Sequence, residues 1–191
     1  ESDTDWHIVA ILDRAISDGK LGDAQILVRE HPVSEMARGE LKASPRVVFD
    51  VPFTSFDGGG REFKEITADD MKHLADSIFW SDVTINICST LTIDAAAFDK
   101  PVINIGFEVR AQKYASESPT QFYHMAHYKN ALKTGGIKFV RGKDELTEWS
   151  RRFLTNPQID SAGRKRLVAE QCVFIDGKSG ERIAHVILEL M

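Results

Sequence analysis

Residues 81–107 read SDVTINICSTLTIDAAAFDKPVINIGF, and this stretch decides the fold. The apolar run at 83–87 predicts a buried strand, the Cys-Ser-Thr turn at 88–90 follows it, and a helix is expected to begin at once. A Lys-Pro pair then introduces a second apolar strand at 102–107. A strand, a helix and a parallel strand form the repeating unit of open α/β sheets. The stretch therefore predicts a hydroxyl-bearing turn at the carboxyl edge of such a sheet.

The same alternation runs through the whole chain. Strands are predicted at 25–29, 46–51, 83–87, 102–107 and 137–140, and their sequences are almost continuously apolar. Helices are predicted between a cap at Asp3 or Thr4 and Gly19, from Thr67 through Phe79, from Thr90, and over 120–133, 144–154, 160–173 and 180–191. The segment 52–64, which contains DGGG, is expected to be a mobile loop. This pattern predicts an α/β, Rossmann-like three-layer fold with a mainly parallel sheet of about five or six strands, in a single domain over residues 1–191.

The composition is typical of a globular protein and argues against nucleic acid and membrane as partners. The 191 residues are 42% hydrophobic and 28% charged, and the net charge of -5 gives no indication of nucleic-acid binding. No apolar run approaches the ~20 residues that span a bilayer, and no signal peptide is recognised. Cys88 and Cys172 lie in apolar contexts and are expected to be buried thiols in a reducing compartment rather than a disulfide. These features together predict a cytoplasmic location.

Ser89 and Thr90 are candidates for binding a diphosphate. The start of a helix has unpaired backbone N–H groups and carries the positive end of the helix dipole, so it attracts phosphate. Open α/β sheets also bind their ligands at the carboxyl ends of their strands. The simpler alternative is that both residues only cap the helix, a position that Ser and Thr prefer for backbone reasons.

Asp94 and the turn Arg29-Glu30-His31-Pro32 add candidates at the same edge. Asp94 lies one helical turn after Thr90, where a carboxylate can reach a ribose hydroxyl pair, or where it simply complements the helix dipole. Arg29 and His31 follow the first strand and are expected to face the same edge as the 88–90 turn. They are candidates to contact phosphate, with His31 as a candidate acid. The alternative is a turn with solvated side chains.

Several well-known functional motifs do not occur in the sequence. It contains no GxGxxG, no P-loop, no GxSxG and no HExxH. His124 and His127 are predicted to share a helical face, but no third His, Cys or carboxylate has suitable spacing for a metal. Neither a metal site nor a cofactor is expected.

Three segments together resemble the C-terminal half of GT-B-type glycosyltransferases. They are ILVREHP at 26–32, DMKHLADSIFWSDVTINICSTLTIDAAAFDKPVINIGF at 70–107 and DGKSGERIA at 176–184. The chain looks most like the bacterial surface-polysaccharide group, which includes CDP-glycerol glycerophosphotransferases and capsule or lipopolysaccharide sugar transferases. The resemblance spans residues 24–187, although its specific motifs occupy only a small part of that range.

The resemblance implies a role for each candidate residue. Arg29 and His31 match an R-x-HP turn in the donor cleft, Ser89 and Thr90 match the diphosphate-binding pair, and Asp94 matches the acid that holds the donor ribose. This chain departs from the pattern at two positions. Asp94 stands where many relatives have Glu, and Asp99 stands where a small residue, usually Gly, precedes Lys-Pro.

GT-B enzymes have two Rossmann-like domains, and the acceptor is bound largely by the N-terminal one. The resemblance implies that this chain is the donor-nucleotide-binding half of a metal-independent glycosyltransferase or glycerophosphotransferase, without the N-terminal acceptor domain and the first strand of its own domain. The expected ligand is a nucleotide-diphosphate sugar or a CDP-linked donor, bound weakly and without turnover by this chain alone. Any peripheral contact with the inner membrane would come from the missing domain. Two other interpretations stay open: a nucleotide-sugar 2-epimerase-like isomerase domain, and a non-catalytic Rossmann-like binding domain.

Overall fold

The computed structural model describes residues 4–29, 44–50, 54–55, 64–65, 67–108 and 118–190. The helices are α1 (Thr4–Ser17), α2 (Ala68–Trp80), α3 (Leu91–Ala97), α4 (Ala126–Lys133), α5 (Lys143–Thr155), α6 (Ser161–Gln171) and α7 (Ser179–Glu189), with the 3-10 helix η3 (Pro119–His124) before α4. The strands are β1 (Ile26–Arg29), β2 (Val47–Asp50), β3 (Thr54–Ser55), β4 (Lys64–Glu65), β5 (Thr84–Asn86), β6 (Val102–Ile105) and β7 (Lys138–Val140). Every predicted strand is confirmed, and its ends differ from the predicted ones by no more than two residues.

Three parallel strands form the main sheet, in the order β5-β6-β7. Thr84 pairs with Val102 across the first interface, and Asn104 pairs with Phe139 across the second. β6 lies in the centre, and all four of its residues are buried. The turn that follows β5 therefore lies beside the best-buried strand of the described chain.

A second parallel sheet contains only β1 and β2, with Ile26 opposite Val47. β3 and β4 form a short antiparallel pair of their own. The prediction of one sheet of about five or six strands is therefore wrong, because the described parallel strands fall into a pair and a triplet. No strand within the described ranges lies between β1 and β5 to join them. The coarser prediction of an α/β fold with parallel strands is confirmed, and the arrangement is compatible with a Rossmann-like fold.

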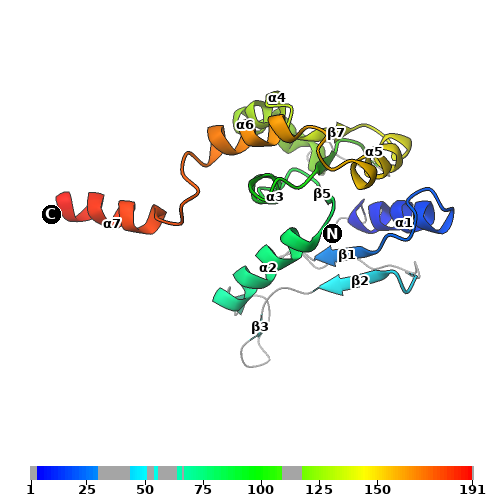
Figure 1. Cartoon of the computed structure of the whole chain (residues 1–191), viewed down its shortest axis with the longest axis horizontal. Coiled ribbons are helices and arrows are strands. Elements are labelled where there is room, and N and C mark those ends of the chain that lie inside the picture. The colour runs from blue at the N-terminus through cyan, green and yellow to red at the C-terminus, as the bar shows by residue number, and fades with distance from the viewer. Residues whose placement is uncertain are drawn as a thin grey trace.

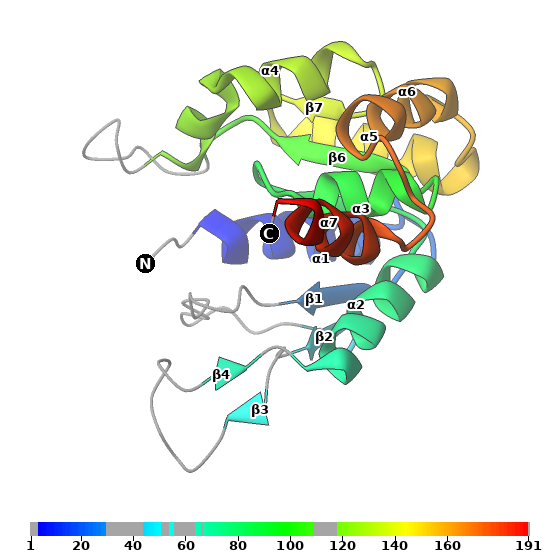
Figure 2. The ribbon, with the colours of Figure 1, turned by 90° about the vertical axis from the view of Figure 1, so that its left-hand side faces the viewer.

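Helices cover both faces of the main sheet (Figures 1 and 2). On one face, α1 and α5 contribute Leu12 and Leu146 to a buried cluster that also contains Ile103 and Ile105. On the other face, α2, α3, α4 and α6 enclose Val102 in a second cluster. Alternate residues of β6 thus enter different clusters, as the period of a strand requires. The result is a helix-sheet-helix sandwich around the main sheet.

The helix predicted over 120–133 is broken in two. The 3-10 helix η3 ends at His124, and the extended backbone of Met125 (φ -67°, ψ 142°) separates it from α4. His124 and His127 consequently lie on different elements, and the prediction that they share one helical face is wrong.

The C-terminal helix α7 extends away from the rest of the chain (Figure 1). None of its side chains is buried, and its apolar residues Ile183, Val186, Ile187 and Leu188 are exposed. Neither α7 nor any other described helix combines the length and the apolar composition that crossing a membrane requires.

Candidate functional site

The turn from β5 into α3 carries Cys88, Ser89 and Thr90 at the carboxyl end of β5, as predicted. Cys88 has a φ of 45°, in the left-handed region that residues other than glycine rarely occupy. Such conformations persist where surrounding contacts impose them, and they concentrate at functional sites. The contacts around this turn therefore decide its shape.

A polar network fixes the turn to the sheet and to α4. Asn86 Oδ1 accepts hydrogen bonds from the Ser89 N–H at 3.3 Å, from the Thr92 hydroxyl at 3.1 Å and from the Asn104 amide at 2.9 Å. The Tyr128 hydroxyl lies 3.0 Å from Asn104 Oδ1 and 3.3 Å from the Ser89 carbonyl oxygen. Thr92 and Asn104 are buried, so leaving either of them unpaired would cost about 1–3 kcal/mol. The network therefore fixes the turn against β6 and α4.

Most backbone N–H groups of the turn already have partners. Cys88 donates to a tyrosine hydroxyl of η3 at 2.8 Å, Leu91 donates to Ser89 Oγ at 3.2 Å, and Thr92 donates to the Ser89 carbonyl. Thr90 has helical backbone angles, and its side chain makes no capping hydrogen bond. The expectation of a set of unpaired N–H groups is therefore wrong. Between 88 and 92, only the N–H of Thr90 lacks a partner among the described residues.

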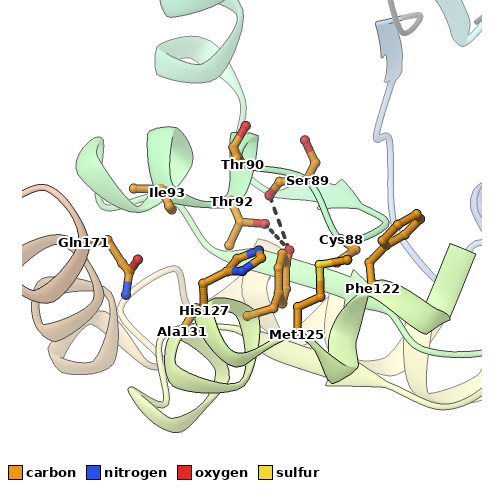
Figure 3. Close-up of a pocket in the computed structure, with 11 residues that line it drawn as sticks. Cys88, Ser89, Thr90, Thr92, Ile93, Phe122, Met125, His127, Ala131 and Gln171 are labelled. Carbon is orange, nitrogen blue, oxygen red and sulfur yellow. Dashed lines mark hydrogen bonds between the residues drawn. The ribbon is translucent and has the colours of Figure 1, made fainter.

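A cavity of about 150 Å³ lies against this turn (Figure 3). Its other walls come from α3, η3, α4 and α6, with Ile93, Met125 and His127 among the lining side chains. Figure 3 shows the hydroxyl groups of Ser89 and Thr90 pointing away from His127 and Met125. The turn thus has two different sides. One side bounds a largely apolar cavity, and the other presents the two hydroxyls.

Burial keeps the acidic groups beside the cavity protonated. Desolvation raises the pKa of the Cys88 thiol to about 11 and that of the Tyr128 hydroxyl to about 12. It also raises the pKa of Tyr123, whose ring packs edge-on against Tyr128 with centroids 5.0 Å apart. A thiol that stays protonated is a poor nucleophile, so Cys88 is not suited to covalent catalysis.

One donor beneath the turn lacks a partner. Nδ2 of Asn86 is buried and forms no hydrogen bond to any described residue. The network fixes the orientation of this amide, since Asn86 Oδ1 receives three donors. Buried N–H groups without a partner are rare in native proteins. Its burial also keeps this donor out of reach of a ligand on the surface of the turn.

Arg29 emerges at the same edge as the turn but does not line the cavity. β1 and β6 run in the same direction (Figure 2), so their carboxyl ends lie on the same side. The Arg29 guanidinium forms an ion pair with Asp50 at the end of β2, and Asp50 also lies 3.4 Å from His73 Nε2. His31, the candidate acid, lies outside the described residues.

Asp94 is exposed on α3 and does not line the cavity. Desolvation raises its pKa. Burial raises the pKa of Cys172, and the charge of Asp94 raises it further, which places Asp94 near the end of α6. The structure therefore brings Ser89 and Thr90 together at the turn, and it leaves Asp94 on a neighbouring surface.

Neither a metal centre nor a disulfide emerges from the described part of the chain. No group of three or more His, Cys, Asp and Glu side chains in it is placed to hold a metal ion. Cys88 and Cys172 are both free, as expected, and both are partly exposed rather than fully buried.

The sequence interpretation missed the residues that hold the turn. Asn86 and Asn104 each interrupt an apolar strand in the same way, as Ile-Asn-Ile at 85–87 and at 103–105. Because the two strands pair in register, these asparagines lie side by side, and the repeated pattern was an available signal. Tyr123 and Tyr128 offered no such signal, since their contact with the turn depends on how η3 and α4 pack.

Comparison of the chain with protein-family models, with curated proteins and with solved structures found no match.

Proposed function

We propose that this chain binds the diphosphate of a nucleotide-linked donor at the 88–90 turn. In this proposal it is the donor-binding half of a GT-B-type glycosyltransferase or glycerophosphotransferase of bacterial surface-polysaccharide biosynthesis. The observation that carries the proposal is the rigid turn at the carboxyl end of β5, with the hydroxyls of Ser89 and Thr90 on the side away from the cavity. Parallel α/β sheets bind ligands at this edge.

The groups available at the turn suit a diphosphate. The hydroxyls of Ser89 and Thr90 and the Thr90 N–H offer neutral hydrogen-bond donors. Arg29 supplies a cation at the same edge, and its ion pair with Asp50 holds it in place. Donors that are fixed before the reaction stabilise the negative charge that grows on a departing nucleoside diphosphate. The base that deprotonates the acceptor hydroxyl would belong to the acceptor domain.

A non-catalytic Rossmann-like binding domain is the second candidate. One observation favours it: Asp50 already neutralises Arg29. The two candidates differ in whether the turn responds to a nucleotide diphosphate.

Nuclear magnetic resonance tests the proposal, because it detects weak binding and locates it. We expect CDP, UDP or GDP, added at millimolar concentration, to shift the amide signals of Ser89 and Thr90. The double variant Ser89→Ala/Thr90→Ala should weaken this binding by roughly 1–3 kcal/mol, or about 5- to 150-fold, because charge-assisted hydrogen bonds are lost. The matched control is Thr147→Ala/Thr155→Ala on α5, which removes two hydroxyls far from the turn and should change nothing.

Three results would count against the proposal. Equal affinity in the double variant and in wild type would show that the hydroxyls do not bind phosphate. Shifts confined to cavity residues such as Ala131 and Gln171 would place the ligand on the other side of the turn. Absence of any response to all three nucleotides would favour the non-catalytic domain.

A further inference from the structure

The C-terminal arm, residues 173–190, carries an apolar face that is open to solvent. Four side chains follow the helical spacing of three and four residues and therefore share one face of α7 and its C-cap: Ile183, Val186, Ile187 and Leu190. Each of these four side chains, which together form the α7 face, is more than half exposed. Figure 1 shows α7 extending away from the other elements, so the α7 face lies on an arm and not on the body.

The order of the four residues makes the α7 face self-complementary. In an antiparallel pair of α7 helices related by a two-fold axis, Val186 of each copy can lie opposite Ile187 of the other. The same alignment places Ile183 opposite Leu190, because these two positions are equally far from the axis. All four side chains of one helix then meet apolar partners, as the two-fold interface of a homodimer requires.

The charged residues beside the α7 face favour the same direction of pairing. Arg182 and Glu189 each precede a residue of the face, so both lie on one flank of it, near opposite ends of the helix. Glu181 lies on the far side of α7. Antiparallel pairing brings Glu189 of each copy toward Arg182 of the other and sets opposite ends of the helix dipoles side by side. Asp176 already holds this guanidinium at 2.5 Å, and its remaining N–H groups can bind a second carboxylate.

The link between α6 and α7 allows the arm to change direction. Val173 has a φ of 56°, in the left-handed region, where a β-branched residue is an outlier. The N–H of Phe174 donates to the Cys172 carbonyl at 2.5 Å, which makes a γ-turn of the strained kind around Val173. The Val173 side chain is exposed, so its packing does not impose this conformation. The helices of two copies can therefore align without distortion of either body.

The exposed apolar side chains supply the area of a weak dimer. Phe174 is 57% exposed, and its ring centroid lies 4.1 Å from the Arg182 guanidinium carbon, so it extends the α7 face along the charged flank. With Phe174, the face offers several hundred Å² per copy, the size of exposed patch that marks an interaction site. Two such faces approach the lower end of the ~1,200–2,000 Å² that specific interfaces bury.

We propose that the α7 face is a homodimerisation surface, which binds the same face of a second copy in an antiparallel helix pair. The body of each copy lies outside the contact, so the dimer joins two bodies through their arms. The inference does not depend on nucleotide binding at the 88–90 turn.

Sedimentation velocity of the full chain, from micromolar to millimolar concentration, tests the proposal. We expect a reversible equilibrium between monomer and dimer, with no larger species. Ile187→Lys places two cations beside the two-fold axis and should weaken the dimer about tenfold or more. Leu188→Lys is the matched control, because it introduces the same charge at the adjacent exposed residue, which lies on the opposite side of α7, and it should change nothing.

Mixtures of variants test the direction of pairing. Ile183→Glu and Leu190→Lys place opposite charges across the interface only in the antiparallel pair, so their mixture should form a heterodimer about tenfold tighter than either homodimer. Ile183→Glu mixed with Ile183→Lys is the control, since these two side chains meet only in a parallel pair. All the substituted residues are exposed, so each variant should keep the helix content of wild type in circular dichroism.

Four outcomes would overturn the proposal. A monomer at every concentration would show that the α7 face binds no second copy. Equal weakening by Ile187→Lys and Leu188→Lys would place the contact elsewhere on the chain. Tighter association in the control mixture than in the antiparallel mixture would show that the helices pair in parallel. Species larger than a dimer would show a contact that two-fold symmetry does not close.

Discussion

At the scale of single residues, Asp99 shows how an unusual backbone conformation is held in place. Its φ of 53° is one that glycine adopts freely and that Asp tolerates better than most residues. The fully buried Arg164 donates to Asp99 Oδ1 at 2.7 Å, and its other nitrogens donate to the carbonyls of Ile159 and Pro157. Ser161 adds a hydrogen bond at 2.9 Å. Aspartate therefore ties the turn before β6 to α6, which a glycine at this position could not do.

This arrangement makes stability depend on pH. Burial alone would raise the pKa of Asp99, but the hydrogen bonds from Arg164 and Ser161 outweigh it and lower the pKa. A carboxylate with a lowered pKa stabilises the folded state above its unfolded pKa of about 3.9, and the contribution is lost as the pH falls through the folded value. We expect Asp99→Asn to lower the unfolding temperature at neutral pH, and the difference from wild type to shrink below about pH 4.

Thermal unfolding followed by circular dichroism from neutral pH to about pH 3 measures this difference. Glu148→Gln is the matched control, because hydrogen bonding to Arg151 lowers the pKa of Glu148 but both side chains are exposed. Exposed ion pairs contribute about 0–1 kcal/mol, so this control should remain close to wild type. A destabilisation by Asp99→Asn that stays constant over the whole pH range would rule out the electrostatic explanation.

At the scale of elements, two glycines allow α6 to pack against the segment before β7. A Cβ atom at Gly163 would lie 2.2 Å from the Gly135 carbonyl oxygen, and one at Gly136 would lie 2.6 Å from the backbone of Gly163. Both clashes involve backbone atoms, which cannot move aside as a flexible side chain does. The contact holds α6 in place, where Leu167 completes the cluster around Val102.

We therefore expect Gly163→Ala to destabilise the fold by roughly 1–3 kcal/mol, as overpacking does. The opposing gain in helix propensity is about 1 kcal/mol at most. Gly180→Ala in α7 is the matched control, since a Cβ there meets no atom within 4 Å. Urea unfolding should show a lower midpoint for Gly163→Ala and an unchanged midpoint for the control. Equal midpoints in the two variants would show that the close approach can relax.

The elements themselves could be predicted well where a pattern is local. Apolar runs predicted the strands, and the helix predicted from Thr67 is confirmed, with Thr67 as its N-cap in a capping box with Asp70. The break at Met125 could not be predicted, because no glycine or proline marks it and tertiary packing of the two tyrosines accompanies it. The close approach of Gly136 to Gly163 in α6 could not be predicted either, since it joins residues far apart in the sequence.

At the scale of the whole molecule, the contacts between segments far apart in the sequence could not be predicted. Five strands were predicted from the sequence, but their division into a β1-β2 pair and a β5-β6-β7 sheet was not. The candidate site shows the same limit. Ser89 and Thr90 were placed correctly at a strand's end by local pattern, whereas the separation of Asp94 from the cavity follows from the packing of α3 against α6.

The exposure of the C-terminal arm, residues 173–190, also could not be predicted from local sequence pattern. The helix predicted over 180–191 is present, yet Val173, Phe174 and Ile175 are exposed and α7 buries no side chain. A helix that buries no apolar surface contributes little to the stability of the body it extends from. Exposed apolar surface of this extent instead promotes association.

Ending the chain after Cys172 should therefore leave the unfolding temperature within about 1 °C of wild type, below the shift of about 2–4 °C that 1 kcal/mol produces in a domain of 150–250 residues. The same truncation should reduce self-association, which sedimentation velocity at several concentrations measures. A second truncation, after Asp160, is the comparison, because it also removes α6 with the fully buried Arg164 and Leu167 and should abolish cooperative unfolding. If removing the arm alone lowers the unfolding temperature substantially, α7 packs on the body in solution and its apolar face is covered there.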